Sequence, residues 1–429
     1  MIKFSLTKLG LIILLSIAMH STGLAVVKYD ELEVQIDSQS LSIKKIEPKS
    51  TASDNKDLII WVAPGYGTSQ RAMDMSADLS KLGLEIWYVD LAESLFLPKS
   101  TSTMRNLDGK YLAGLIEYAH KKTNKRITLL TRSYGAIPVL RAARQWQLKH
   151  AGTENFYLNG AILYSPELYS KVPSLGLEPE FVSITEATNI PLMIFQSGKR
   201  GNRWQIKKLL SKLQSSGAAV YFKILKGVTG VFYSGDKKAA TLKQIELMPK
   251  KIQAVIKLFS KTEKPEQVAM LKHKVDVQAK SLDIKLKSYK ANPTPHVLDL
   301  VDVFGKRHTT NNYKGKVTVI NFWATWCPPC VQEIPSLNNL RQLMANEKFE
   351  LISVNYGEDK EAILSFMKKV NVDFPVLLDP SGKEAKKWNV LVFPSTFVIA
   401  PNGLIKYGVN AAIHWDDPSV VKALKALLK

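Results

Sequence analysis

The sequence predicts an α/β protein with two domains, and three observations carry this prediction. The chain has 429 residues, which is more than one ordinary hydrophobic core organises. Short apolar segments alternate with helical patterns through most of the chain, an order that favours mostly parallel sheets covered by helices. A Lys-rich stretch at 260–295 interrupts this alternation, and a second alternation follows it.

The first domain is expected to cover 26–259. Apolar residues recur at helical spacing in 111–122 and 204–214, and a last helix is expected at about 239–259. The candidate strands are apolar throughout, as strands covered on both faces are, and they are 58–63, 84–89, 127–132, 160–165, 191–196 and 220–225. The pattern therefore predicts a mostly parallel sheet with helices on both sides.

A linker at 260–295 and a second domain at 296–429 complete the chain. The linker holds eight Lys and three Pro, and short alternations within 275–286 indicate a small strand pair. Helices of the second domain are expected after the two cysteines, near 360–370 and at the C-terminal end. Its strands are expected in VTVINFW, FELISVN, FPVLLD, STFVIA and LIKYGV.

The first 25 residues have the layout of a secretory signal peptide. Lys3 and Lys8 precede an apolar run over 9–19, and Gly23 and Ala25 occupy the small-residue positions before a cleavage site. The apolar run is short for a membrane span, so cleavage after Ala25 is expected, with an uncleaved anchor as the alternative. The protein is therefore predicted to be periplasmic or otherwise exported.

The net charge of +21 comes from Lys residues spread over most of the chain. Nucleic acid is not an expected partner, because the sequence has no arginine-rich groove-binding helix and no Cys/His finger spacing. Outside the cytoplasm, an anionic membrane surface is the better match for such a charge. Solubility alone accounts for the charge equally well.

The only two cysteines, Cys327 and Cys330, form a Cys-Pro-Pro-Cys pair between an apolar strand and a helix. Unpaired N–H groups and the helix dipole stabilise a thiolate at Cys327, which makes it a nucleophile. Cys330, about one turn inside the helix, is placed to attack the mixed disulfide that follows. A zinc site would need two further ligands, so no metal is expected, and no cofactor beyond the redox-active Cys327–Cys330 disulfide. A disulfide that only braces the turn is the alternative.

On these residues the second domain resembles the thioredoxin fold of the TlpA/ResA type, a group of exported thiol–disulfide oxidoreductases. The resemblance covers about 296–429, and its matched positions are Trp326-Cys327-Pro328-Pro329-Cys330, Glu333, Pro335, Phe393-Pro394-Ser395-Thr396 and Lys314-Gly315-Lys316. It implies catalytic roles for Cys327, Cys330 and Glu333, with Glu333 exchanging a proton with Cys330; a solvated glutamate is the alternative. It implies substrate-binding roles for Phe393, Pro394 and Trp326, with a client strand pairing to the backbone at Phe393.

The same resemblance implies a function, the reduction of disulfides in envelope client proteins, with cytochrome c maturation as one setting. The implied partners are proteins that carry disulfides or thiols. A membrane thiol reductase is the implied electron donor. The residues themselves leave the direction of exchange open, because the reduction potential depends on thiolate stability.

The first domain resembles the α/β-hydrolase fold over about 57–258. Thr131-Arg132-Ser133-Tyr134-Gly135 lies one residue away from the Gly-x-Ser-x-Gly elbow that presents a nucleophilic serine. Ala63-Pro64-Gly65-Tyr66-Gly67 lies where that family has an oxyanion loop. A general base is missing, because no His occurs between His150 and His273. Ser133, Tyr66 and Tyr134 are therefore assigned to a vestigial hydrolase site.

Two other functions stay open at this point. The position of the hydrolase acid holds no carboxylate in 197–203, and Glu167 is the alternative acid. A serine esterase or peptidase would use Ser133 with a base from His120, His150 or the second domain. An adaptor would use the first domain to recruit clients for the second.

Overall fold

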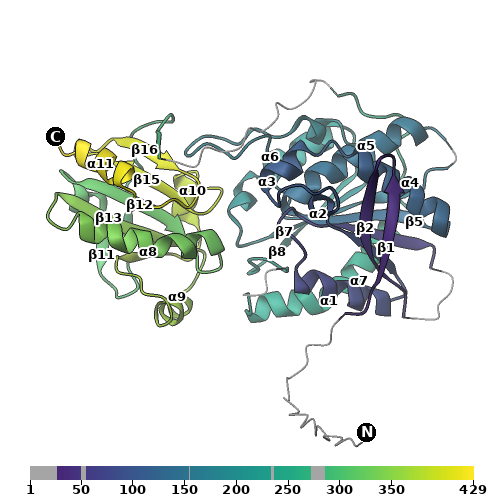
Figure 1. Ribbon diagram of the computed structural model, residues 1–429, viewed down its shortest axis with the longest axis horizontal. Coiled ribbons are helices and arrows are strands. Elements are labelled where there is room, and N and C mark those ends of the chain that lie inside the picture. The colour runs from purple at the N-terminus through teal and green to yellow at the C-terminus, as the bar shows by residue number, and fades with distance from the viewer. Residues whose placement is uncertain (1–26, 50–54, 154, 233–235, 272–285) are drawn as a thin grey trace, which may run out of the picture.

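The protein consists of an N-terminal and a C-terminal domain that lie side by side (Figure 1). The computed structural model describes residues 27–49, 55–153, 155–232, 236–271 and 286–429. The expected signal segment, 1–25, and nearly all of the strand pair expected within 275–286 lie outside these residues. Among the helices of the described ranges, none combines the length and the apolar character that crossing a membrane requires.

An eight-stranded sheet forms the centre of the N-terminal domain, with the strand order β1-β2-β4-β3-β5-β6-β7-β8. Strands β3 to β8 are parallel, whereas β1 and β2 form a hairpin that pairs antiparallel with β4. The strands are β1 (Asp30–Ile36), β2 (Gln39–Ile46), β3 (Asp57–Val62), β4 (Glu85–Val89), β5 (Arg126–Arg132), β6 (Leu158–Tyr164), β7 (Leu192–Ser197) and β8 (Val220–Leu225).

The six strands predicted for this domain are present, each within two residues of its expected ends. The β1–β2 hairpin was not predicted. Exposed and buried residues alternate over 33–36 and 40–43 of its two strands, for example Glu33 and Gln35 against Val34 and Ile36. This half-buried pattern differs from the buried runs of β3 to β7, because the hairpin lies at the edge of the sheet, as β8 does at the other edge.

Helices cover both faces of the N-terminal sheet (Figure 1). Helices α1 and α7 contribute buried residues to the core on one face, and α4, α5 and α6 contribute to the core on the other. The helices are α1 (Gln70–Lys81), α2 (Leu91–Ser94), α3 (Thr101–Asn106), α4 (Lys110–Thr123), α5 (Ala136–His150), α6 (Ile206–Ser215) and α7 (Ala239–Phe259), with 3-10 turns η1 (Ser133–Gly135), η2 (Ser183–Glu186) and η3 (Gly201–Gln205). The α7 bounds match the helix predicted at 239–259.

A six-stranded sheet forms the centre of the C-terminal domain, in the order β14-β13-β12-β15-β16-β9. Strands β12, β13 and β14 are parallel, and β15, β16 and β9 continue the sheet in antiparallel pairs. The strands are β9 (Lys287–Ser288), β12 (Val317–Trp323), β13 (Phe349–Tyr356), β14 (Val376–Asp379), β15 (Ser395–Ile399) and β16 (Ile405–Val409). The sheet therefore takes in β9 from the segment predicted as a linker.

The C-terminal sheet is also covered on both faces. Buried residues of α8 and α11 pack on one face, and those of α10 pack on the other. The helices are α8 (Pro328–Leu343), α9 (Lys360–Met367), α10 (Lys383–Lys387) and α11 (Pro418–Ala426), with the 3-10 turn η4 (Thr310–Tyr313) and a separate hairpin of β10 (Asp299–Val301) and β11 (Arg307–Thr309). The central strand β12 leads directly to the cysteines at the start of α8.

Candidate active site

Both cysteines lie where β12 ends and α8 begins. Cys327 is the N-cap residue of α8, and its sulfur accepts a hydrogen bond from the Cys330 N–H at 3.3 Å. Pro328 stands in the first turn, where a missing N–H costs the helix nothing. Pro328 and Pro329 have no N–H, so the Cys330 N–H and the helix dipole are the groups directed toward the sulfur of Cys327, an arrangement that favours negative charge there.

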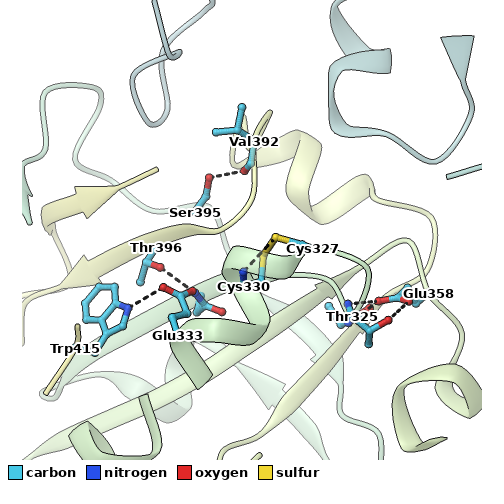
Figure 2. The surroundings of a disulfide bond; sticks show 11 residues. Thr325, Cys327, Cys330, Glu333, Glu358, Val392, Ser395, Thr396 and Trp415 are labelled. Atoms are coloured by element: carbon cyan, nitrogen blue, oxygen red, sulfur yellow. Dashed lines mark hydrogen bonds between the residues drawn. A yellow bond between two sulfur atoms is a disulfide. The ribbon is translucent and has the colours of Figure 1, made fainter. Parts of the chain in front are cut away.

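The two sulfurs are joined in a disulfide bond (Figure 2). Cys327 exposes 5% of its surface and Cys330 exposes 1%, while Pro328 and Pro329 between them are exposed. Cys327 is therefore the more accessible of the two, and Cys330 is enclosed by the helix and the core. This difference is what a nucleophile and a resolving thiol require.

A loop beside the disulfide carries the predicted proline. Residues 391–395, called here the proline loop, include the first residue of β15, which pairs with β12 and so brings the loop next to the cysteines (Figure 2). The Phe393–Pro394 peptide bond is cis. The ring of Trp326 meets that of Phe393 edge to face at 5.9 Å between centroids. The structure thus gathers Trp326, Phe393 and Pro394 on one side of the dithiol.

Glu333 lies on α8 one turn beyond Cys330 and is buried, with 3% of its surface exposed. Its carboxylate accepts hydrogen bonds from the Asn321 amide at 2.8 Å and the Trp415 indole at 3.1 Å (Figure 2). The Asn321 amide also donates to the Thr396 hydroxyl at 2.9 Å. A solvated glutamate is thereby excluded.

Burial raises the pKa of Glu333 to about 7, although hydrogen bonds from Trp415, Asn321 and the backbone of Ile413 favour its charged form. The carboxyl group therefore gains or loses a proton close to neutral pH. Among the described residues, no hydrogen bond joins Glu333 to either sulfur. The geometry places Glu333 behind the dithiol rather than in contact with it.

Glu358 holds the segment that precedes Cys327. Its carboxylate accepts hydrogen bonds from the Thr325 N–H at 2.7 Å and the Thr325 hydroxyl at 2.6 Å (Figure 2). The Asn355 amide donates to the same carboxylate at 3.1 Å. Glu358, Asn321 and Trp415 were not predicted as site residues. Of these three, only Asn321 could have been noticed in the sequence, because it is a polar residue inside an apolar strand.

Ser133 lies in the turn between β5 and α5, with a left-handed backbone conformation. Ser133 follows β5 with φ of 53°, a left-handed conformation that non-glycine residues rarely adopt. It exposes 6% of its surface, and its hydroxyl has no hydrogen-bond partner among the described residues. The Glu167 N–H donates to the Ser133 carbonyl at 3.1 Å, so Glu167 lies next to the turn.

The charged groups around Ser133 do not form a triad. Glu167 pairs with Arg200 at 2.8 Å, and Arg200 lies in the loop where the hydrolase acid was sought. Tyr66 is half exposed; desolvation and the Glu167 carboxylate raise the pKa of its phenol, so it is not a base at neutral pH. Tyr134 is buried, with the Arg105 guanidinium 5.1 Å above its ring.

The two histidines considered as a base contact other residues. His120 stacks on Tyr157 at 3.7 Å between centroids and hydrogen-bonds the Lys125 carbonyl. His150 stacks on Trp146 at 4.6 Å. Neither has a contact with Ser133 in the described part of the chain. Among the described residues, the structure thus brings Ser133, Tyr66 and Tyr134 together, and neither His120 nor His150 is placed there as a base.

Comparison with known proteins agrees with the C-terminal geometry. A family model described as Redoxin matches residues 285–424. Thiol-disulfide oxidoreductase ResA from Geobacillus kaustophilus (strain HTA426) is 33% identical over 118 residues, which are 28% of this chain and 68% of that protein. The chain belongs to the ResA family of thiol-disulfide oxidoreductases. ResA from Bacillus subtilis (strain 168) is 40% identical over 106 residues, which are 25% of this chain and 59% of that protein.

Solved structures give matches of the same kind. A thiol:disulfide interchange protein of the thioredoxin family from Chlorobium tepidum TLS shares 26% identity, with a TM-score of 0.28, over 33% of this chain and 99% of that one. StoA from Bacillus subtilis shares 24% identity, with a TM-score of 0.27, over 32% of this chain and 99% of that one. The Redoxin match and the ResA relatives show that this chain carries thiol–disulfide oxidoreductase chemistry in its C-terminal part. Its N-terminal domain lies outside the matched family model.

Proposed function

We propose that this protein is an exported thiol–disulfide oxidoreductase that reduces disulfides of envelope client proteins through Cys327 and Cys330. The Cys327 thiolate attacks a client disulfide and bonds to one client sulfur, while the other leaves and takes up a proton. The Cys330 thiolate then attacks the Cys327 sulfur, which releases the second client thiol and leaves the Cys327–Cys330 disulfide. Two electrons thus pass from the dithiol to the client.

The observation that carries this proposal is the unequal setting of the two sulfurs at one helix start. Cys327 caps the helix at its open end and is the more accessible sulfur, and Cys330 is enclosed one turn further on. The proline loop lies alongside, so a client strand that pairs with the backbone of Phe393 would bring its disulfide to Cys327.

Glu333 is assigned to the second step. Cys330 must lose its proton before it can attack, and Glu333 is the buried carboxyl group that follows it on the same helix. With a pKa of about 7, Glu333 accepts a proton at neutral pH and returns it at little cost, as efficient acid–base groups do. Asn321 and Trp415 hold the carboxylate in place.

The cellular setting belongs to the same proposal. The layout of residues 1–25 supports export to the periplasm or an equivalent compartment. A membrane thiol reductase would return electrons to the disulfide, and cytochrome c maturation is one process that consumes such a reductant. The basic surface would favour contact with anionic lipid.

The test is reduction of a peptide disulfide by the pre-reduced protein under single-turnover conditions. Wild type should reduce the peptide, and Cys327→Ser should lower the rate by at least about 1,000-fold because the nucleophile is removed. Equal rates for the two proteins would refute the proposal. A bracing disulfide predicts that equality, together with a lower thermal stability of the variant.

A further inference from the structure

Two loops of the N-terminal domain contact the C-terminal domain beside the dithiol. They follow the parallel strands β6 and β7, so both begin at the carboxyl ends of these strands. Figure 1 shows this side of the N-terminal domain turned toward the C-terminal domain. The proposed thiol–disulfide exchange uses Cys327, Cys330 and Glu333 and no residue of either loop, so the loops are candidates for another role.

The loop after β7, 199–204, lies against the proline loop. The Lys199 ammonium donates a hydrogen bond to the Pro380 carbonyl at 2.6 Å, and the Arg203 guanidinium donates to the Ser381 carbonyl. Gly201 sits so close that a Cβ there would lie 2.8 Å from the Leu391 carbonyl oxygen. The same Cβ would lie 3.4 Å from the ring of Phe393, the residue to which a client strand is expected to pair.

The loop after β6 holds the other end of the proline loop. The Asn410 amide donates to the Pro173 carbonyl at 2.6 Å, and the Asn410 oxygen accepts from the Ser395 hydroxyl at 2.7 Å. Ser395 follows the cis-proline, so one side chain links the two domains to that segment. Leu175 of the same loop is buried in the core cluster of the C-terminal domain.

A third contact lies on the opposite side of the dithiol. Lys238 of the N-terminal domain and Asp359 form an ion pair at 3.9 Å. Asp359 follows Glu358, which holds Thr325 two residues before Cys327. The N-terminal domain therefore contacts both segments that flank the dithiol, the proline loop and the loop after β13.

An ion pair between partly exposed Arg200 and buried Glu167 holds the loop after β7 to the N-terminal domain. Arg200 turns inward to Glu167 beside Ser133, while its neighbours Lys199 and Gly201 contact the C-terminal domain. The pair favours this position of Arg200, because moving it away would leave the buried Glu167 carboxylate without its charged partner. The loop that would carry a hydrolase acid is thus fixed against the client site of the other domain.

We propose that the N-terminal domain is a client-selecting element that forms one wall of the dithiol site and admits disulfides only in flexible polypeptide segments. This inference rests on the proposed function. An extended segment is thin enough to pair with Phe393 between the two flanking loops, whereas a folded client would have to displace 199–204. Specificity of this sort comes from excluding the wrong partner as much as from binding the right one.

The experiment compares two disulfides of different bulk on the full-length, pre-reduced protein. One is an unstructured Gly/Ser-rich peptide closed by a single disulfide, and the other is native insulin. The kcat/KM for each is measured in wild type and in Lys199→Ala/Arg203→Ala. This double variant removes the hydrogen bonds to Pro380 and Ser381 and adds no bulk.

A control variant loses the same two positive charges as Lys199→Ala/Arg203→Ala, but at positions whose partners lie within the N-terminal domain. Lys110→Ala/Arg126→Ala removes one Lys and one Arg, whose acidic partners are Asp37 and Asp57 of the same domain. Hydrogen exchange over 379–383 reports whether the contact between the domains has opened. A second opening variant, Gly201→Val, forces the loop away from Leu391 by bulk instead of by lost hydrogen bonds.

In Lys199→Ala/Arg203→Ala and in Gly201→Val, the kcat/KM for insulin divided by the kcat/KM for the peptide should rise at least about fivefold. The kcat/KM for the peptide should stay within about twofold of the wild-type value. The control should match wild type. A ratio that stays constant while 379–383 exchanges faster would overturn the inference, and so would an equal fall for both substrates. Failure of wild type to reduce the peptide through Cys327 would instead contradict the proposed function itself.

Discussion

Ser133 and Cys327 each lie where a buried strand of their sheet, β5 or β12, gives way to a helix. Both are largely buried, at 6% and 5% exposure. Around Cys327 the structure supplies a second sulfur on the next turn and a carboxyl group that titrates near pH 7. Around Ser133 the nearby carboxylate, Glu167, is neutralised by Arg200, and the hydroxyl has no partner in the described part of the chain.

The comparison teaches that a strand-to-helix turn presents a nucleophile without activating it. A cysteine at a helix start needs little more, because the thiolate forms readily and backbone N–H groups favour its charge. A serine needs an adjacent base, since its hydroxyl is a weak nucleophile at neutral pH. The same local geometry therefore places a reactive sulfur in one domain, whereas His120 and His150, the two histidines considered as its base, do not contact the serine in the other.

The largest effect expected from this comparison is a contrast between two substitutions. Cys327→Ser should lower disulfide reduction by at least about 1,000-fold, and Ser133→Ala should change it by less than about twofold. Hydrolysis of p-nitrophenyl acetate, measured on the same samples, should be the same for wild type and Ser133→Ala. A loss of ester hydrolysis in Ser133→Ala would break the comparison and restore the esterase hypothesis.

Cys330→Ser should separate the two chemical steps. Cys327 can still attack a client disulfide, but no neighbouring thiol releases the product, so the mixed disulfide accumulates. Non-reducing electrophoresis of the variant after incubation with the disulfide peptide should show a covalent adduct at Cys327. The control is Cys327→Ser/Cys330→Ser, which should show none. Adduct formation in that control would assign the attachment to a group other than Cys327.

The pH dependence of stability should reveal the buried carboxyl group. The folded state raises the pKa of Glu333 from its ordinary 4.5 to about 7, so between these values the folded state binds the proton more tightly. Stability should therefore fall as pH rises from about 5 to 8, by about 3 kcal/mol in total. Below pH 4.5 both states are protonated, so the stabilisation by Glu333 has its full value and no longer varies with pH.

Glu333→Gln should remove that fall. Hydrogen exchange of the β12 amides, followed from pH 5 to 8 and corrected for intrinsic rates, measures it in the domain concerned. At pH 5 the variant should be the less stable by about 1 kcal/mol, because its amide nitrogen faces one of two hydrogen-bond donors. At pH 8 the order should reverse. Parallel profiles for the two proteins would contradict the assigned pKa.

The same substitution should slow turnover moderately. Without a proton acceptor behind Cys330, the second step of peptide reduction should fall by about tenfold at pH 7. The wild-type rate should show an inflection near pH 7 that is absent from Glu333→Gln. If Glu333 had only a structural role, the substitution would lower the rate but leave the inflection. Glu358→Gln is the matched control, since Glu358 holds Thr325 and lies away from Cys330. An inflection that persists in Glu333→Gln would assign it to another group.

The smallest effect concerns the backbone at Ser133. Glycine adopts φ of 53° without strain, so Ser133→Gly should raise stability by about 1 kcal/mol. Ser133→Ala keeps the strain and removes a hydroxyl that has no partner among the described residues, so it should change stability by less than about 0.5 kcal/mol. Thermal unfolding midpoints of the N-terminal domain compare the two. Destabilisation by both would indicate a structural role for the hydroxyl.

Much of the fold was predictable because its strands are extreme in composition. The apolar runs of β3 to β7 and β12 to β15 are largely buried on both faces, so their composition alone indicates strands. The hairpin of β1 and β2 was missed because its alternation of Leu and Ile with Glu, Gln and Lys is shared by many exposed segments. Strand β9 was missed because two residues carry no pattern.

The candidate site divides in the same way. Cys327, Cys330, Glu333 and the proline loop follow from local spacing and a family resemblance. Trp415 contacts Glu333 from 82 residues downstream, and Asn410 reaches Pro173 across 237 residues. Contacts of this range depend on how the sheets and domains pack, and no spacing in the sequence encodes them.

The most direct test of the central claim is the rate at which iodoacetamide alkylates each thiol of the reduced, full-length protein at pH 6.5. The helix start should hold Cys327 as a thiolate, so Cys327 should react at least about tenfold faster in the folded protein than in urea. Cys330, enclosed in the helix, should react more slowly when folded. Equal rates for Cys327 in the folded and unfolded chains would contradict the account.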